Sequence, residues 1–506
     1  MTKRPYNQEK IKKVFQQSAI FFKNKEYNKS INLLKKILKY SPSNLPALNL
    51  LGAVHFETNH FDDSEKIFFK GLNISPNDFM TLKNLAHLME KKGEYFEAQK
   101  YYKKILSSST VPINWKEKIF NNLGNVYYNL NNLTEAKSYY LEAIKENNNY
   151  SEAYNHLGFI HKEQQNFSEA AKCFKKALQI NSNFAEAQVN YSLMLLLLED
   201  FKEGWKKYEW RFEKKNAFAL KRNFPQPFWN NENLESKSLL IWGEQGIGDE
   251  IMFSKIFLDF KLKNTSINVE CDKRLVPLFR RSFKNIIFYE KSNPPNTKLL
   301  SEKISFQLGI GSLGKFFRNR IEDFPSLTQY LLPNNEKVVK LRKKYKQISD
   351  NKILVGISWK SGNKQFGKKR SIELKLWEKI ILNQNFFFVN LQYGDVVNEI
   401  NEFKNIYKKE IFHDKEINSL KSIDDFAAQI AALDLVISVD NSTVHLSGAL
   451  GKNTWTLLPN TPEWRWSMKR EYSLWYPKMR LFRQNRNGSW QDVFDRIDKT
   501  LKKSFK

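Results

Sequence analysis

Small and large side chains alternate along the first 212 residues with a nearly constant period. Small residues recur at spacings of 34, 34, 38, 34 and 34 positions: Ser18, Gly52, Ala86, Gly124, Gly158 and Ser192. Twelve positions after each of these stands a second small residue: Ser30, Ser64, Ala98, Ala136, Ala170 and Gly204. Four positions further on, each unit has a large apolar or aromatic residue: Leu34, Phe68, Tyr102, Tyr140, Phe174 and Tyr208. A fixed period of this length predicts an array of repeated units.

The pattern resembles the tetratricopeptide repeat, whose 34-residue unit consists of two antiparallel helices. The resemblance implies six units over residues 11–212, in which the small pair lets the two helices approach and the large residue fills the gap between units. The spacing of 38 places an insertion in the loop around residues 107–112. Such arrays form a curved superhelix with a concave binding face.

Polar residues stand two positions before most of the first small residues. The six residues at this position are Gln16, Leu50, Asn84, Asn122, His156 and Asn190. In the tetratricopeptide arm of protein O-GlcNAc transferases, asparagines here line the concave face and hold an extended peptide. Because an amide both donates and accepts hydrogen bonds, Asn84, Asn122 and Asn190 are predicted to contact an acceptor peptide. The competing interpretation is that asparagine is simply common in this sequence.

The hydrophobic pattern changes after Tyr208. Residues 213–236 are charged and polar and are interpreted as a linker or docking segment. Short apolar runs then alternate with helical stretches, which predicts parallel sheets covered on both faces. Strands are expected at 238–242, 266–271, 286–290, 353–359, 386–392, 435–439 and 454–459. Two Rossmann-like domains, 237–345 and 346–506, with a cleft between them are therefore predicted.

The glycine-rich turn after the first of these strands differs from a dinucleotide fingerprint. Gly243, Gly246 and Gly248 are present, but Ile251 stands where the third glycine of that pattern belongs. Asp249 also occupies the start of the following helix, where a carboxylate repels a pyrophosphate. No nicotinamide or flavin cofactor is expected. Asp249 is favoured there by the helix dipole and is predicted to face the cleft.

Polar residues follow the strand 435–439, at the edge where open α/β sheets bind ligands. The segment 440–443 precedes a helix start, whose backbone amides form a ready anion site. Three further segments are expected at the same edge: the basic loop 359–370, residues 391–395 and residues 459–466. For single residues, a purely structural role is the competing interpretation. His445 would then be a core histidine, Trp464 and Trp466 would be ordinary packing residues, and the lysines would belong to a solvated loop.

Four segments together resemble the tetratricopeptide-linked glycosyltransferases whose catalytic half is similar to glycosyltransferase family 9, the ADP-heptose transferases. The segments are Gly246–Asp249, Val355–Trp359, Asp440–Ala449 and Trp464–Trp466. The resemblance implies a fold in which an α-solenoid is followed by an α/β GT-B region. In GT-B, two Rossmann-like domains bind the acceptor on the N-terminal side and the nucleotide sugar on the C-terminal side.

The resemblance also implies site residues. Asp249 is the expected general base, and Gly246 and Gly248 lie on the acceptor side. The expected residues for the nucleotide-sugar donor are Lys360, Arg370, Gln392, Asp440, Asn441, Ser442, Thr443, His445 and Trp464. The match of Lys360 is loose because the loop around it differs. The sequence has no heptose-recognition pattern, so the sugar and the nucleotide base stay open.

These inferences predict an inverting transfer of a sugar from a nucleotide diphosphate sugar to a hydroxyl, with no metal or other cofactor. The acceptor is expected to be a protein chosen by the repeat arm. Two alternatives stay open: a protein-interaction scaffold with a non-catalytic α/β half, and an enzyme that glycosylates lipopolysaccharide or another envelope glycan.

Composition bears on the partners and the compartment. Of the 506 residues, 82 are Lys or Arg and 54 are Asp or Glu, a formal net charge of +28, but no nucleic-acid-binding motif accompanies this charge. Nucleic acid is therefore not an expected partner, whereas peripheral contact with anionic lipid is compatible with the basic surface. Apolar runs are too short for a membrane span. The two cysteines, Cys173 and Cys271, lie far apart and form no disulfide framework, which favours the cytoplasm.

Overall fold

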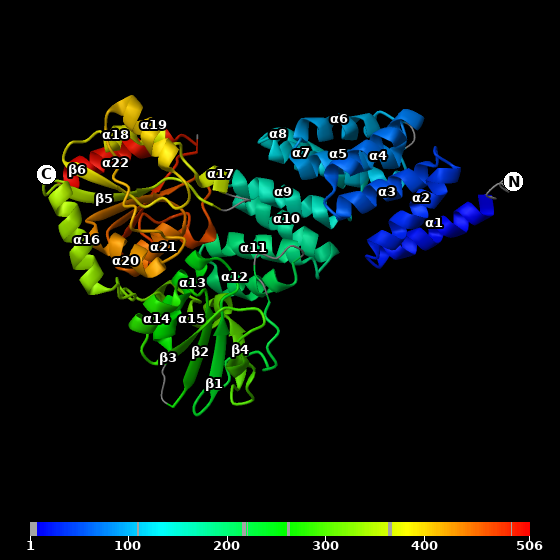
Figure 1. Cartoon of the computed structure of the whole chain (residues 1–506). Helices are drawn as coiled ribbons and strands as arrows, with labels where there is room; N and C mark the ends of the chain where they lie inside the picture. Colours follow the sequence, from blue (N-terminus) through cyan, green and yellow to red (C-terminus); the bar gives the residue numbers. More distant parts are fainter. Residues whose placement is uncertain are drawn as a thin grey trace. The chain divides into compact units, whose positions relative to one another are not determined.

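The computed structural model describes residues 8–108, 111–214, 219, 221–260, 264–362, 367–486 and 488–505. It divides into two compact units, Met1–Phe184 and Ala185–Lys506. The first unit consists of helical hairpins, and the second contains one further hairpin and two parallel sheets (Figure 1).

The first unit is built from five pairs of antiparallel helices. Their bounds are α1 Gln8–Lys23, α2 Tyr27–Tyr40, α3 Leu45–Glu57, α4 Phe61–Ile74, α5 Phe79–Lys92, α6 Tyr95–Leu106, α7 Lys116–Asn129, α8 Leu133–Glu146, α9 Ser151–Glu163 and α10 Phe167–Ile180. A short 3-10 helix, η1 Ile113–Trp115, follows the predicted insertion. The helix pairs have the predicted period, so the helical repeat array is confirmed.

The small residues allow ring-on-backbone packing within each pair. A methyl group added to Gly52 would lie 2.3 Å from Phe68 Cε1, and one added to Gly124 would lie 2.4 Å from Tyr140 Cε1. Phe68 also belongs to one apolar cluster with Leu82 of the next pair. At Gly52 the sixteen-residue spacing thus arises because the Phe68 ring covers the glycine while it packs against the following unit.

A buried hydroxyl reinforces several of these crossings. Ser30 Oγ donates to the carbonyl oxygen of Ser18 at 2.9 Å, and Ser64 Oγ donates to that of Gly52 at 2.8 Å. Both serines are fully buried, so the hydrogen bond satisfies an otherwise costly polar group. A residue that is small and also able to donate explains why serine shares this repeat position with alanine and glycine.

The second unit begins with the sixth predicted repeat. Its helices are α11 Ala185–Leu197 and α12 Phe201–Tyr208, followed by the 3-10 helix η2 Glu209–Phe212. Ser192 Oγ donates to the carbonyl oxygen of Gly204 at 2.8 Å, which joins the same two repeat positions as in the first unit with donor and acceptor exchanged. This hairpin therefore has the repeat geometry but belongs to the compact unit that contains the sheets.

The first sheet has four parallel strands in the order β3-β2-β1-β4. They are β1 Ser238–Trp242, β2 Ser266–Cys271, β3 Ile286–Glu290 and β4 Phe306–Gly309. The sequence predicted the first three and missed β4. Its accompanying helices are α13 Ile247–Ser254, η3 Lys255–Asp259, α14 Val276–Ser282, η4 Thr297–Leu300, η5 Ile310–Leu313, α15 Gly314–Phe317 and η6 Ile321–Asp323.

Part of the predicted linker covers the edge of this sheet. The backbone N–H of Trp229 donates to the carbonyl of Gln307 in β4 at 2.9 Å, and Gln307 N–H donates to Pro227 at the same distance. The Gln307 side chain donates to the carbonyls of Phe224 and Gln226, both at 2.8 Å. The segment is thus docked along β4, where it shields an otherwise open strand edge.

The second sheet has five parallel strands in the order β6-β5-β7-β8-β9. They are β5 Ile353–Ser358, β6 Phe386–Asn390, β7 Leu435–Val439, β8 Thr454–Leu458 and β9 Met479–Arg483. Four of these were predicted, and β9 was missed. After β5 the chain forms a 3-10 turn, η7 Leu374–Trp377, which is continued by a short helix, α18 Glu378–Ile381.

Helices cover both faces of the second sheet, as parallel strands require. In Figure 1, α20 and α21 lie on one face and α18, α19 and α22 on the other. The remaining bounds are α16 Asn335–Ile348, α17 Gly367–Arg370, α19 Val397–Tyr407, α20 Ile423–Ala432, α21 Ser442–Ala449, η8 Trp464–Trp466 and α22 Trp490–Ser504. The C-terminal α/β region with parallel sheets is therefore confirmed.

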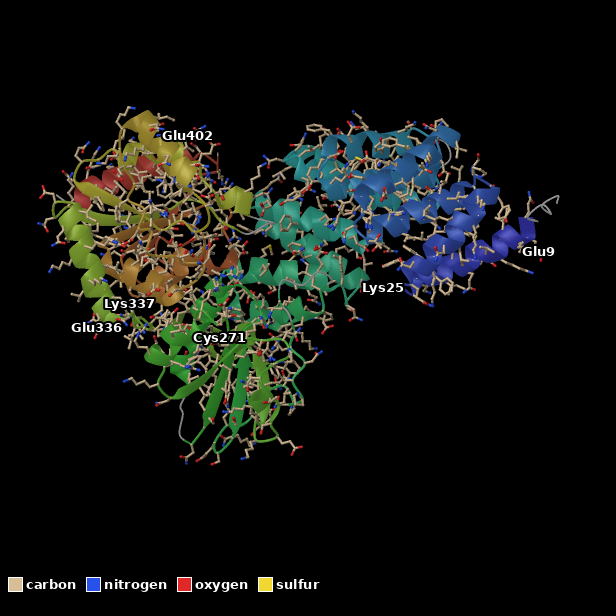
Figure 2. The ribbon with its side chains drawn as sticks, viewed as in Figure 1. Glu9, Lys25, Cys271, Glu336, Lys337 and Glu402 are labelled. Carbon is tan, nitrogen blue, oxygen red and sulfur yellow. The ribbon has the colours of Figure 1, made fainter. Side chains whose placement is uncertain are left out.

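Several helices of this unit have exposed charged side chains, whereas its cysteine is buried. Glu336, Lys337 and Glu402 are exposed on the helical surface, whereas Cys271 lies inside the half built on β1 to β4 (Figure 2). Both cysteines of the chain are free and buried. Burial raises the pKa of the Cys173 thiol to about 11 and that of the Cys271 thiol well above its usual range. Neither is therefore activated as a nucleophile.

Candidate functional site

The carboxyl edge of the second sheet is fixed by two buried amide side chains. Gln392 Oε1 accepts hydrogen bonds from Ser358 Oγ at 2.9 Å and from the backbone N–H groups of Trp359 at 2.9 Å and Lys360 at 2.7 Å. Asn441 Nδ2 donates to Ser358 Oγ at 2.8 Å and to the carbonyl of Lys360 at 3.0 Å. The two predicted donor-binding amides thus tie the ends of β5, β6 and β7 together.

Asn441 also begins helix α21. Its Oδ1 accepts from the Thr443 backbone N–H at 2.9 Å, which is the usual N-cap hydrogen bond. The Thr443 hydroxyl is fully buried and has no hydrogen-bond partner among the described residues. The start of α21 therefore has both backbone amides and a buried hydroxyl.

Helices α13 and α21, which follow one strand of each sheet, meet near their N-terminal ends. Gly246 is the N-cap of α13, which follows β1, and α13 packs against α21, which follows β7. A methyl group added to Gly248 would lie 2.9 Å from His445 Cδ2 and 3.6 Å from Ser442 Cα. Gly248 is thus required for this close approach. The geometry brings Asp249 and the segment 440–445 to one place, as the sequence predicted from separate motifs.

A chain of alternating charges crosses this meeting point. Asp249 Oδ1 accepts from Arg465 NH2, and Arg465 NH1 lies 3.5 Å from Glu463 Oε2. The other oxygen of Glu463 accepts from Arg370 NH2 at 2.5 Å. Arg370 NH1 then lies 3.2 Å from Asp440 Oδ2, an ion pair without the directed geometry of a hydrogen bond. Three carboxylates and two guanidinium groups are therefore linked between the two sheets.

Most of these charged groups are removed from water. Arg465 has 12% of its side chain exposed, Asp249 17% and Asp440 4%. Burial alone lowers the pKa of the Arg465 guanidinium, but Asp249 and Glu463 more than offset this and raise it. Arg465 is therefore permanently charged. The Asp249 carboxylate, the predicted base, is ion-paired in this structure.

His445 is a buried neutral ring. Its Nδ1 lies 3.0 Å from the Tyr476 hydroxyl, and the ring stacks on Trp466 with centroids 5.2 Å apart. Burial, followed by the charge of Arg465, lowers the pKa of His445 to about 3. The histidine thus has a partner in the core, as expected of a core histidine, and stays uncharged at neutral pH.

One predicted donor-binding residue, Lys360, has another partner here. Lys360 is exposed and its ammonium contacts Glu399 Oε2 at 2.6 Å. Exposed pairs of this kind contribute little to stability and exchange readily. Residues 363–366 of the predicted phosphate loop, between Lys360 and Arg370, lie outside the described residues.

Trp464 is covered by protein side chains. Its ring lies against four other aromatic rings, with centroid distances of 5.3 Å to Trp205, 6.0 Å to Tyr208, 6.2 Å to Phe253 and 6.4 Å to Trp475. Only 5% of the residue is exposed. Stacking of this ring on a base or sugar, as predicted from the sequence, is not open to it in this structure.

The rings around Trp464 show that the sixth repeat is joined to both halves of the α/β region. Trp205 Nε1 donates to the carbonyl of Arg318 at 2.7 Å, and Glu199 accepts from Arg470 Nε at 2.6 Å. Arg211 forms a bidentate pair with Glu244 at 2.7 and 3.0 Å, and both residues are buried. This attachment was not predicted from the sequence, in which Trp205 and Arg211, close to Tyr208, are its local signal.

The predicted peptide-contacting asparagines lie on the first helices of their hairpins. Asn84 on α5 and Asn122 on α7 are half-buried in the first unit, and Asn190 is half-buried on α11 in the second. Asn122 Nδ2 donates to the Tyr102 hydroxyl at 3.3 Å, so part of its hydrogen-bonding capacity is used inside the array. Peptide contact by these residues stays a prediction.

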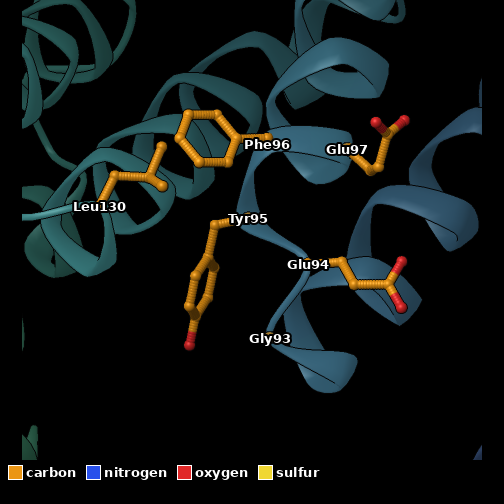
Figure 3. A pocket seen from close by; sticks show the side chains of 6 residues that line it. All are labelled: Gly93, Glu94, Tyr95, Phe96, Glu97 and Leu130. Atoms are coloured by element: carbon orange, nitrogen blue, oxygen red, sulfur yellow. The ribbon is translucent and has the colours of Figure 1, made fainter.

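A shallow depression also occurs on the first unit. It has a volume of about 300 Å³ and is lined by Gly93, Glu94, Tyr95, Phe96, Glu97 and Leu130 (Figure 3). Phe96 is 69% exposed. None of the predicted site residues lines this depression, which lies at the turn between α5 and α6 and next to the end of α7.

Two absences among the described residues concern membrane spans and metal sites. No helix there is both long enough and apolar enough to cross a bilayer. No group of three or more His, Cys, Asp or Glu side chains in the same residues has an arrangement suited to a metal ion.

Three models of the tetratricopeptide repeat family match the N-terminal part of the chain, at residues 21–87, 117–150 and 151–184. Among curated proteins, the chain is similar to protein FlbA of Caulobacter vibrioides, with 27% identity over 496 residues, 95% of this chain and 82% of the relative.

Solved structures with a similar part include that of pilF from Pseudomonas aeruginosa, with 16% identity and a TM-score of 0.36, covering 41% of this chain and 91% of that one. MamA from Desulfovibrio magneticus RS-1 matches with 17% identity and a TM-score of 0.31, covering 34% of this chain and 96% of that one. From its own residues and the matching family models, this chain carries tetratricopeptide repeats ahead of a C-terminal α/β region with two parallel sheets.

Proposed function

We propose that this protein is a glycosyltransferase of the GT-B type that moves a sugar from a nucleotide diphosphate sugar to a hydroxyl of a protein. Support comes from two parallel sheets in one unit and from the motifs that resemble glycosyltransferase family 9. The single observation that carries the proposal is the meeting of α13 and α21. It brings a carboxylate, Asp249, together with a capped helix start and two guanidinium groups.

These groups suit the two ends of a glycosyl transfer. The α21 amides and Arg370 would bind the diphosphate and stabilise the negative charge that develops as it leaves. Asp249 would accept a proton from the attacking hydroxyl. His445 is neutral and would act by hydrogen bonding or packing, because its pKa of about 3 excludes a positive charge at neutral pH.

The proposed step balances as a single displacement. The bond between the anomeric carbon and the diphosphate oxygen breaks, and its electron pair leaves with the diphosphate. The acceptor oxygen forms a new bond to the anomeric carbon from the opposite face, so the configuration inverts. The proton of the acceptor hydroxyl goes to the Asp249 carboxylate.

The repeats support a protein acceptor. Tetratricopeptide arrays commonly bind proteins or peptides on their concave face. In the second unit, the sixth repeat contacts the turn with Trp464 that immediately precedes Arg465. A chain held on the α11 surface would therefore be near the proposed reaction centre.

The test is calorimetric binding of UDP, ADP, GDP, CDP and dTDP to the full chain. One preferred nucleoside diphosphate is expected, with binding lost in Arg370→Gln and in Thr443→Val. Arg496→Gln is the matched control, since Arg496 forms an exposed pair with Asp492 on α22, at 2.8 Å. Binding of none of the five would overturn the proposal.

If no nucleoside diphosphate binds, a second function is favoured, and the tetratricopeptide repeats support it. The chain would then be a protein-interaction scaffold whose α/β half does not transfer sugar. The scaffold predicts that Asp249→Ala leaves the cellular function intact, whereas the transferase predicts that the same variant loses it.

A further inference from the structure

Arg465 is a largely buried cation at the proposed site that was not among the predicted donor-binding residues. It lies on the 3-10 turn η8, with its guanidinium 4.8 Å from the centre of the Trp464 ring. It contacts Asp249 from the first half and Glu463 from its own turn. Its Nε is buried and has no hydrogen-bond partner in the described part of the chain. The guanidinium therefore has one donor still unused at the meeting of the two halves.

One carboxylate joins Arg465 to Arg370. Glu463 accepts from Arg370 through Oε1 and faces Arg465 through Oε2. The two guanidinium groups are thus separated by about the width of a carboxylate. A diphosphate has two adjacent anionic groups and can pair with both cations in place of Glu463. Guanidinium groups pair with phosphate oxygens in the same bidentate way as with carboxylates.

With the charged groups paired as in this structure, the net charge of the cluster opposes the binding of an anion. Asp249, Glu463 and Asp440 outnumber Arg465 and Arg370 by one, so the linked groups have a surplus of negative charge when all are ionised. The Asp249 oxygen that accepts from Arg465 is also not open to the hydroxyl of an acceptor. An incoming anion that takes Arg465 away from Asp249 frees this oxygen, whereas the surplus of negative charge remains and lowers the affinity for the anion.

We infer that Arg465 is a diphosphate-binding residue that exchanges Asp249 for the phosphate when the nucleotide binds. The inference rests on the proposed function and extends it. Nucleotide binding would release the Asp249 carboxylate for the acceptor hydroxyl, so the nucleotide sugar binds before the acceptor. When the nucleotide is bound, Asp249 acts as the base. When the nucleotide is absent, Asp249 pairs with Arg465 and so competes with the phosphate for it.

This competition makes an unusual prediction about affinity. Asp249→Asn removes the competing carboxylate while preserving shape, and it should tighten binding of the preferred nucleoside diphosphate by about tenfold, the value of one charged hydrogen bond. Arg465→Gln should weaken that binding by about tenfold or more. Damage to the fold can only weaken binding, so a gain of affinity separates exchange from a merely structural role.

The experiment is calorimetry with the nucleoside diphosphate panel on the full chain, the two single variants and the Asp249→Asn, Arg465→Gln double variant. The tightening by Asp249→Asn should vanish in the Arg465→Gln background, because there is no guanidinium left to release. Arg496→Gln and binding of the corresponding nucleoside without phosphates are the controls, and neither should change.

The outcomes separate the exchange from the proposed function. If the wild type binds a nucleoside diphosphate but Asp249→Asn does not tighten it, the exchange is wrong and the transferase proposal stands. The same holds if the tightening persists without Arg465, which would indicate a general effect of charge. If neither the wild type nor Asp249→Asn binds any of the panel, both proposals fail together.

Discussion

Removing Arg211 tests whether the sixth repeat is an integral part of the α/β unit. Arg211 is fully buried, as is Glu244, and the two are joined by two hydrogen bonds of 2.7 and 3.0 Å. The guanidinium also donates to Glu209 Oε1 and to Ser312 Oγ, each at 2.7 Å. Arg211→Met fills a similar volume, removes the positive charge and leaves the Glu244 carboxylate buried without its counter-charge.

The expected cost follows from that uncompensated charge. Breaking a buried pair by removing one partner typically destabilises a protein by about 3–5 kcal/mol, whereas replacing both partners by apolar residues costs much less. Arg211→Met should therefore lower the free energy of unfolding of the second unit by about 3–5 kcal/mol. The double variant Arg211→Met, Glu244→Leu should recover a large part of this loss.

Urea unfolding followed by tryptophan fluorescence measures both effects, because Trp205 and Trp464 contact the Tyr208 ring, whose centre lies 4.6 Å from the Arg211 guanidinium. Arg496→Met, in an exposed pair with Asp492, is the control and should change the unfolding free energy by no more than about 1 kcal/mol. An Arg211→Met variant as stable as the control would refute the attachment. A double variant less stable than Arg211→Met would refute the charge argument.

Three further predictions concern packing, acidity and the sheet edge. Gly124→Val should destabilise the first unit by about 3 kcal/mol, because the new side chain overlaps Tyr140; an unchanged urea transition followed by circular dichroism would contradict this. His445 has a folded pKa of about 3 against 6.5 unfolded, so the unfolded chain binds more protons between these values, and stability should fall by a few kcal/mol as the pH is lowered from 6.5 to 3. Unfolding curves of His445→Gln should lose that part of the acid sensitivity, and equal sensitivity would show that other groups cause it. Gln392→Leu should weaken nucleotide binding and lower the Tm because three buried donors lose their acceptor, whereas Gln392→Glu should retain most of both; equal losses in calorimetry would mean that the acceptor oxygen is unimportant.

Local patterns were enough for the repeats and for most strands. The repeat period is visible because Gly52, Gly124 and Gly158 each lie against an aromatic ring sixteen residues later, so the packing constraint is short in sequence. Strands β4 and β9 were missed for a local reason. β4 has four residues, and β9 contains two arginines among its apolar residues, so neither forms an apolar run.

In the candidate site, too, local patterns predicted some features and not others. The sequence placed Asp249, the α21 start and Arg370 at strand ends, and the structure brings them together. The pairing of Asp249 with Arg465 could not be predicted from the sequence, because the two residues are 216 positions apart and belong to different halves of the α/β region. The sequence also could not predict that Trp464 would be buried, since the rings that cover it come partly from the sixth repeat.

By itself, then, the sequence determined the helical repeats, the two series of parallel strands and the helix starts that follow them. Each of these depends on periodicity, capping and strand ends, which involve neighbours within a few dozen residues. Only the tertiary structure decided that the sixth repeat joins the α/β unit and that Asp249, Arg465, Glu463, Arg370 and Asp440 form one chain of charges. Such pairings depend on how separate elements pack, and burial then gives a charged partner its large effect because water no longer screens it.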